Sequence, residues 1–164
     1  MEEKTGGILE LIVWLTMLTV VLIDRMLKVY IQGHFFPGQS LVLIPKVFHI
    51  TYVLNPGAAF GLMSGQTWIF IVTAVIVILG VIWAQRKLTD PSLVLRLALG
   101  MIAGGALGNL YDRVKWGLVV DYLDFRVWPF VFNFADSMIV VGVSLLLLTL
   151  YWKEYRGHSQ DEAQ

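Results

Sequence analysis

Four long apolar stretches constrain this chain more than any other feature of its sequence. They cover residues 8–23, 68–84, 93–110 and 137–152. Each approaches the roughly 20 residues that an α-helix needs to cross the hydrocarbon core of a bilayer. Backbone groups without hydrogen-bond partners are not tolerated in lipid, so stretches of this kind cross membranes as helices. The sequence therefore predicts an integral membrane protein with four transmembrane helices.

The composition favours the same class of protein. Hydrophobic residues make up 57% of the 164 residues and charged residues 15%, against about 45–50% and about 25% in soluble domains. A soluble domain of this length has too little interior to bury so much apolar surface. The chain has no cysteine, which excludes thiol nucleophiles, disulfides and thiolate metal sites. Its 12 basic and 12 acidic residues cancel, so the charge balance gives no reason to expect nucleic acid as a partner.

The segments between the apolar stretches predict an asymmetric molecule. The expected spans are residues 8–28, 67–85, 93–111 and 136–152, and the two longer loops are residues 32–66 and 112–135. Each of these loops contains a run rich in β-branched and aromatic residues, 47–54 in the first and 118–122 in the second, which is typical of short strands. We predict an all-α membrane protein, a four-transmembrane-helix bundle forming one domain over residues 1–164, with a small β-containing cap on the side opposite both termini.

The basic residues do not decide which side of the membrane holds the termini. Lys and Arg divide evenly between the two faces, and the positive-inside rule then gives no orientation. Only Arg86 and Lys87, in a short predicted turn, favour cytoplasmic termini. A cleaved signal peptide is the alternative interpretation of the first stretch, but Asp24 and Arg25 follow it where a small-residue cleavage site would stand. We therefore expect an uncleaved first helix.

Acidic residues gather on the capped face of the predicted bundle. They are Asp24, Asp112, Asp121, Asp124 and Asp136. Ionisable groups at membrane depth favour a functional site, but two of these have simple structural explanations. Asp24 and Lys28 are spaced as an ion pair on one helical face. Asn133 is placed to cap the fourth helix, with Asp136 in the first turn near the positive end of the helix dipole.

Asp121 has no local structural explanation, because it lies in the apolar run Leu118–Leu123. Two carboxylates that meet in a poorly hydrated site cannot both ionise easily, so one keeps its proton while the other serves as a base. Such a pair can activate a water molecule and protonate a leaving amine. The sequence contains no H-E-x-x-H zinc motif, no G-x-S-x-G serine motif and no P-loop or dinucleotide glycine motif.

The third apolar stretch carries a pattern of its own. Gly100, Gly104 and Gly108 recur every four residues, and a stripe of small residues lets helices approach closely. Asn109, Asp112 and Arg113 follow directly and give this helix a polar end. Arg113 is suited to holding a carboxylate through two parallel hydrogen bonds.

Five segments occur in the order and spacing of one known family. They are Asp24-x-x-x-Lys28, Asn55-Pro-Gly-Ala-Ala-Phe60, Gly104-Gly-Ala-Leu-Gly-Asn-Leu-Tyr-Asp-Arg113, Val119-Val-Asp-Tyr122 and Phe132-Asn-Phe-Ala-Asp-Ser137. With these segments the chain resembles the bacterial lipoprotein signal peptidase family, or signal peptidase II, from about residue 10 to residue 152. One departure is Arg25, where the family usually has glutamine.

The resemblance implies an aspartic endopeptidase of the bacterial cytoplasmic (inner) membrane, with cytoplasmic termini and an active site near the outer face. Its partners would be membrane lipid and prolipoproteins whose lipobox cysteine carries diacylglycerol, and it would cut just before that cysteine. Asp121 and Asp136 match the catalytic pair of the family. The matching residues that shape the site or bind substrate are Asp24, Lys28, Asn55, Gly57, Asn109, Asp112, Arg113 and Asn133. No metal or cofactor and no nucleic acid is implied.

Two further expectations concern the substrate. The strand at residues 47–54 has an edge that could pair with an extended lipobox, and the loop over residues 55–59 could close over the site.

A small proton- or cation-coupled membrane transporter is the alternative function, since Asp24, Asp121 and Asp136 could form an ion path. Against a transporter, the carboxylates cluster on one face and no inverted repeat is visible in the sequence.

Overall fold

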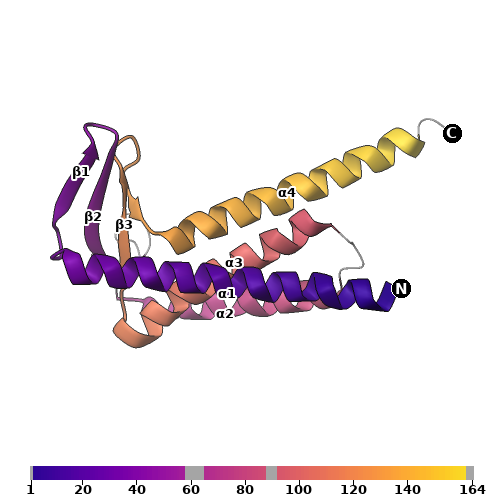
Figure 1. Ribbon diagram of the computed structural model, residues 1–164, viewed down its shortest axis with the longest axis horizontal. Coiled ribbons are helices and arrows are strands. Elements are labelled where there is room, and N and C mark those ends of the chain that lie inside the picture. The colour runs from indigo at the N-terminus through magenta and orange to yellow at the C-terminus, as the bar shows by residue number, and fades with distance from the viewer. Residues whose placement is uncertain (1, 58–64, 88–91, 162–164) are drawn as a thin grey trace.

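The computed structural model describes residues 2–57, 65–87 and 92–161, and within these ranges the side chains of residues 10–156. The elements are α1 (Glu2–His34), β1 (Ser40–Ile44), β2 (Phe48–Asn55), α2 (Thr67–Lys87), α3 (Leu93–Trp116), β3 (Val119–Phe125), β4 (Val131–Phe132) and α4 (Phe134–Asp161). The helices extend from a small sheet at one end of the molecule, and both termini lie at the opposite end (Figure 1). This arrangement confirms the expected cap opposite the termini.

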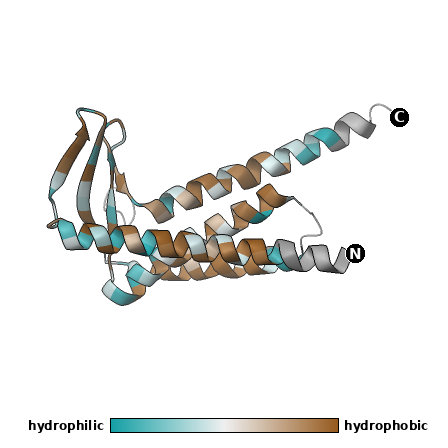
Figure 2. Cartoon of the chain, in the orientation of Figure 1, coloured by the Kyte–Doolittle hydropathy of each residue, from teal (hydrophilic) through white to brown (hydrophobic). Residues whose placement is uncertain are grey.

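Three of the described helices are long and apolar enough to cross a membrane, namely α2, α3 and residues 134–156 of α4. Figure 2 shows that their middle parts are hydrophobic and that hydrophilic residues gather towards the sheet end of α1 and α3. In α3, 67% of the apolar window is buried, against 11% in α2 and α4. The third helix is therefore the centre of the bundle, and the exposed apolar faces of the others suit contact with lipid. A fourth span in α1 stays a prediction.

The glycine stripe of α3 packs against α1, as the spacing predicts. A Cβ atom added at Gly100 would lie 2.8 Å from the Val13 carbonyl oxygen, and one at Gly104 would lie 2.7 Å from Val20 Cβ. At the polar end, a Cβ atom at Gly108 would lie 2.6 Å from Asp24 Oδ2. Glycine is therefore required here because the first helix, and finally the Asp24 carboxylate, occupies the space of a side chain.

The packing of α4 on α3 gives a direct test of this architecture. A Cβ atom at Gly105 would lie 2.4 Å from the Ala135 carbonyl oxygen, so Gly105→Ala should force the two helices apart and lower the free energy of unfolding by about 1–3 kcal/mol. Gly80→Ala in α2 is the matched control, because nothing lies within 4 Å of its added Cβ atom. It should leave stability unchanged or raise it by up to about 1 kcal/mol. Thermal unfolding in detergent measures both, and equal effects would contradict this packing.

The sheet confirms both predicted strands and adds two. The run at residues 47–54 forms β2 and the run at residues 118–122 opens β3, which continues to Phe125. The sheet is antiparallel in the order β1-β2-β3-β4. The second strand is therefore an interior strand where it pairs with β1, over Phe48–Thr51, and over that part of β2 the edge expected to pair with a lipobox is already occupied. The sequence does not predict β1, because Leu41–Ile44 is an unbroken apolar run that lacks strand alternation.

One side of the sheet rests on the end of α1. Ile31, Tyr52, Val120 and Tyr122 are buried together there. Successive side chains of a strand point to opposite faces, so Asp121, between Val120 and Tyr122, is directed away from this cluster. The apolar neighbours of Asp121 thus bury one face of β3 and leave its carboxylate on the other. Of the loop expected to close over the site, residues 58–59 lie outside the described residues.

Candidate active site

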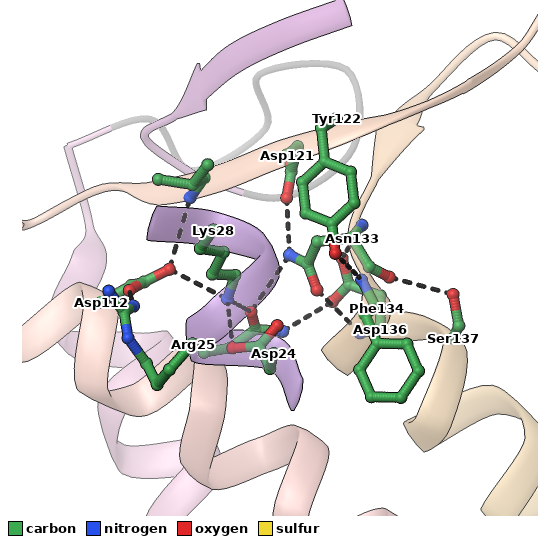
Figure 3. A network of polar contacts seen from close by, with 12 residues as sticks. Asp24, Arg25, Lys28, Asp112, Asp121, Tyr122, Asn133, Phe134, Asp136 and Ser137 are labelled. Carbon is green, nitrogen blue, oxygen red and sulfur yellow. Dashed lines mark hydrogen bonds and ion pairs between the residues drawn. The ribbon is translucent and has the colours of Figure 1, made fainter. Parts of the chain in front are cut away.

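Polar side chains from α1, α3, β3 and the start of α4 meet where the sheet joins the helices (Figure 3), and Asn55 of β2 adds a contact to Asp121. The contributing residues are Asp24, Arg25 and Lys28 of α1, Asn109 and Asp112 of α3, Asp121 of β3, and Asn133 and Asp136 at the start of α4. The structure thus brings together the family-matching residues from segments far apart in the sequence. Asp124 is not among them, because it accepts a hydrogen bond from Thr51 Oγ1 at 2.7 Å and pairs with Arg126 at 3.1 Å.

The start of α4 confirms the predicted helix cap. Asn133 Oδ1 accepts a hydrogen bond from the Asp136 backbone N–H at 2.9 Å, and Asp136 Oδ2 accepts one from the Asn133 backbone N–H at 3.2 Å. This reciprocal pair is a capping box. The other carboxylate oxygen of Asp136 accepts a hydrogen bond from Asn109 Nδ2 at 2.7 Å. A capping role and a place in the polar site are therefore compatible, because the cap holds the carboxylate in position.

Asp121 is only 2% exposed, and each of its carboxylate oxygens accepts a hydrogen bond. Asn133 Nδ2 donates to Oδ1 at 2.7 Å, and Asn55 Nδ2 donates to Oδ2 at 2.8 Å. Burial, reinforced by the nearby charge of Asp136, raises the pKa of Asp121 to about 7. These contributions outweigh the hydrogen bonds, which favour the ionised form. Asp121 therefore carries a proton at pH values where an ordinary aspartate is ionised.

Three asparagines present their amide nitrogens to the two carboxylates. In each, the oxygen is held by a donor behind it, which decides which end of the amide faces the carboxylate. The Gly57 backbone N–H donates to Asn55 Oδ1 at 2.9 Å, and Lys28 Nζ donates to Asn109 Oδ1 at 3.0 Å. For Asn133 the donor is the capping N–H of Asp136. The site is thus built so that all four carboxylate oxygens meet N–H donors.

A buried cluster of charges lies behind these asparagines. The side chain of Lys28 is 0% exposed, and its Nζ lies 2.9 Å from both Asp24 Oδ2 and Asp112 Oδ2. The Asp24 contact confirms the predicted ion pair, although neither oxygen of Asp24 has a well-directed hydrogen bond. Arg25 donates to Asp112 Oδ1 and lies over the Tyr111 ring, 4.6 Å from its centroid. Two cations thus face two carboxylates.

Arg25 is a partner that sequence reasoning missed. It follows Asp24 directly, but Asp112 is 87 positions away in the sequence, and only the close approach of α1 to α3 brings the two together. Tyr122 was also missed, and its hydroxyl oxygen accepts a hydrogen bond from the Phe134 backbone N–H at 3.2 Å. The spacing of charges in a sequence gives no signal for such long-range pairs.

A cavity of about 980 Å³ opens onto both Asp121 and Asp136. Its other lining residues are Val53, Leu54, Asn55, Pro56, Gly57, Arg113, Val119, Phe125, Val127, Trp128, Pro129, Phe130, Val131, Phe132, Ser137, Val140 and Val141. Most of these are apolar, and three residues predicted to shape the site or bind substrate, Asn55, Gly57 and Arg113, are among them. The Arg113 guanidinium lies 4.7 Å from the centroid of the Phe70 ring. The cavity therefore combines apolar walls with a carboxylate pair and one cation, which suits a substrate that is both lipid-like and peptidic.

Comparisons with known proteins show the family of this chain. The family model described as signal peptidase (SPase) II matches residues 16–152. A lipoprotein signal peptidase of Desulfitobacterium hafniense (strain DSM 10664 / DCB-2) is 61% identical over 140 residues, which cover 85% of this chain and 93% of that protein. One of Halothermothrix orenii is 47% identical over 145 residues, covering 88% of this chain and 99% of that protein.

Solved structures are similar as well. A bacterial membrane enzyme determined by the in meso method at 2.3 Å resolution is 32% identical, with a TM-score of 0.81, over 87% of this chain and 88% of that one. A second, determined at 1.9 Å resolution, is 33% identical with a TM-score of 0.77. No finding supports the transporter alternative, and the carboxylates lie together at the sheet end of the described helices (Figure 3). The chain belongs to the signal peptidase II family.

Proposed function

We propose that this protein is an aspartic endopeptidase that removes signal peptides from diacylglyceryl-modified bacterial prolipoproteins and cuts just before the lipidated cysteine. The observation that carries the proposal is that Asp121 and Asp136 open onto one largely apolar cavity and share Asn133 as a hydrogen-bond partner. Aspartic proteolysis needs two carboxylates that share a proton beside a bound peptide. The family to which the chain belongs gives the same activity.

Asp136 serves as the base and Asp121 as the acid in this proposal. Both carboxylates accept two N–H donors. Asp136 also lies in the first turn of α4, at the positive end of the helix dipole, whereas Asp121 lies in a strand, and the helix end favours a carboxylate at Asp136. A water molecule adds to the scissile carbonyl carbon while Asp136 takes its proton and Asp121 gives its own proton to the carbonyl oxygen. When the C–N bond breaks, the nitrogen takes the proton from Asp136, and a hydroxyl of the collapsing intermediate returns a proton to Asp121.

The substrate peptide would enter along the end of β2. Pairing between β1 and β2 stops at Thr51, and the Tyr52 backbone bonds to Gly38 and Gln39 just before β1. Residues 53–55 beyond Tyr52 line the cavity. An extended peptide can add its main-chain hydrogen bonds to such an edge with little regard to its sequence. The Arg113 guanidinium lines the cavity and makes no hydrogen bond or ion pair within the described part of the chain, and it would donate to a substrate carbonyl.

The proposal includes a membrane arrangement. The four helices would form one domain over residues 1–164 in the bacterial cytoplasmic membrane, with α1 as the fourth span. Both termini would be cytoplasmic, and the sheet would lie at the outer face. A mainly apolar segment of α1 separates Glu10 from the ion cluster that begins at Asp24. This pattern is consistent with a span that begins and ends at charged residues.

Cleavage of a defined substrate tests the proposal. The purified protein in detergent would be incubated with a diacylglyceryl-modified prolipoprotein and with the same polypeptide lacking the lipid, and mass spectrometry would identify the products. We expect cleavage only before the cysteine, and a rate at least about tenfold higher for the lipidated form, because buried acyl CH₂ groups stabilise the bound state by up to about 0.8 kcal/mol each. Equal rates for both forms, or cleavage at another bond, would contradict the proposed specificity.

A further inference from the structure

We propose that Lys28 is a positioning residue that acts on Asp136 through Asn109, by fixing which end of the Asn109 amide faces the carboxylate. The inference rests on the role proposed above for Asp136, and it assigns to the buried cation a task in the reaction beyond that of an ion-pair partner. Lys28 itself does not touch the cavity, since it is absent from the cavity lining and fully buried.

The first step of the inference depends on the hydrogen-bonding chemistry of the Lys28 ammonium group. An asparagine amide has an acceptor end and a donor end of nearly equal size, so its orientation depends on its partners. An ammonium group can only donate. Lys28 Nζ lies 3.0 Å from Asn109 Oδ1, which leaves Nδ2 of the same amide 2.7 Å from Asp136 Oδ1. A reversed amide would place its N–H₂ group against the ammonium and its oxygen against the carboxylate.

The second step concerns what else holds Asn109. Asn133 Nδ2 also donates to Asn109 Oδ1, at 3.1 Å, but the same nitrogen donates to Asp121 Oδ1 at 2.7 Å. Asn133 can therefore satisfy its nitrogen without Asn109, whereas Lys28 makes a hydrogen bond to a charged donor, which is the stronger kind. Of the two donors to Asn109, Lys28 is the one that fixes its orientation.

The third step concerns how Lys28 is held in place. Asp24 and Asp112 each lie 2.9 Å from Nζ, and Arg25 donates to the second carboxylate. The cation therefore keeps one position and directs its remaining N–H to Asn109. We call this chain of contacts, from the ion cluster through Lys28 and the Asn109 amide to Asp136, the relay. Because it acts on the base and not on the substrate, it predicts a larger effect on the chemical step than on substrate binding.

A double-mutant cycle tests the relay. Lys28→Met should lower kcat about 10- to 100-fold, the loss expected for one oriented hydrogen bond to a charged group, with less than about a threefold change in KM. Asn109→Ala should lower kcat by a similar factor. In the Asn109→Ala background, Lys28→Met should cost less than about threefold more, because its target amide is gone. If the two losses multiply, Lys28 does not act through Asn109 and the inference is wrong.

The matched control is Arg126→Met, which removes a cation whose carboxylate partner, Asp124, lies outside the site. It should leave kcat within about twofold of the wild type. A kcat loss as large as that of Lys28→Met would show that the loss of any cation near the sheet lowers the rate, and the inference would be wrong. If Lys28→Met does not fold, Lys28→Gln carries the same cycle, because an uncharged amide can donate or accept and so leaves the Asn109 orientation undecided.

This test is separable from that of the proposed function. If Asp136→Asn retains activity, the aspartic mechanism fails whatever the cycle shows. If both catalytic aspartates are essential while the losses at Lys28 and Asn109 multiply, only the positioning role fails.

Discussion

Asp121→Asn and Asp136→Asn should each lower the rate of prolipoprotein cleavage by at least about a thousandfold, because an amide can neither give up nor accept the shared proton. Asparagine keeps the size of the side chain, so the protein should still insert and fold. In each variant the new amide N–H₂ group faces an N–H donor that a carboxylate oxygen accepts in the wild type. This unfavourable contact should lower the free energy of unfolding by about 1–3 kcal/mol. Cleavage assays and thermal unfolding on the same preparations separate the two effects.

Asp124→Asn is the matched control for these variants. Asp124 lies on the same strand as Asp121 and is 5% exposed, but its partners are Thr51 and Arg126. The Asp124→Asn variant should keep more than about a third of the wild-type rate. Its arginine partner is half exposed, and ion pairs of this kind contribute little to stability. If Asp121→Asn kept about a tenth of the wild-type rate or more, the assignment of Asp121 and Asp136 as the catalytic pair would be contradicted. A loss in Asp124→Asn as large as that in Asp121→Asn would show that damage to β3, not chemistry, explains both.

The cleavage rate should also fall steeply above neutral pH. Burial raises the pKa of Asp121 to about 7, so this carboxyl is protonated below that value and loses its proton as the pH rises through it. Once the proton is lost, the acid of the mechanism is missing, and the rate should decrease about tenfold per pH unit, or about a thousandfold at three units above the pKa. At low pH the base becomes protonated as well, so the whole profile should be bell-shaped.

Single-turnover cleavage of a pre-bound lipidated substrate, from about pH 4 to about pH 10, measures this profile. Working with bound substrate removes any effect of pH on association. A rate that peaks below about pH 5 and is negligible at about pH 7 would contradict a raised pKa, even if both aspartates proved essential. A flat profile through about pH 10 would show that no proton on the pair is needed.

Much of this fold follows from patterns that extend over many residues. Apolar length predicts the helices in α2, α3 and α4, and the four-residue glycine spacing predicts the close packing of α3 on α1. The β-branched runs predict β2 and β3. The first strand could not be predicted, because every residue of Ser40–Ile44 is exposed and no alternation marks it. Its place in the sheet depends on pairing with β2, which is a tertiary property.

Only part of the site could be predicted from the sequence. Local rules identify the Asp24–Lys28 pair and the capping role of Asn133, since both depend on helix geometry within a few residues. Asp121 is conspicuous because a carboxylate interrupts an apolar run. The contact of Arg25 with Asp112 and the orientations of the three asparagine amides have no local signature. They depend on which donors the packing of α1, α3 and α4 places behind each amide.

A shared proton on the aspartate pair at neutral pH is the central claim, and carboxyl spectroscopy tests it most directly. Infrared difference spectra of the purified protein, recorded across a pH titration for the wild type and for Asp121→Asn, isolate the C=O stretch of a protonated Asp121 from the other buried carboxyls. We expect a protonated-carboxyl band in the wild type that disappears with a midpoint near pH 7 and is absent from the variant. A band that is lost near the ordinary aspartate value of about 4, or that is unchanged in Asp121→Asn, would contradict the account.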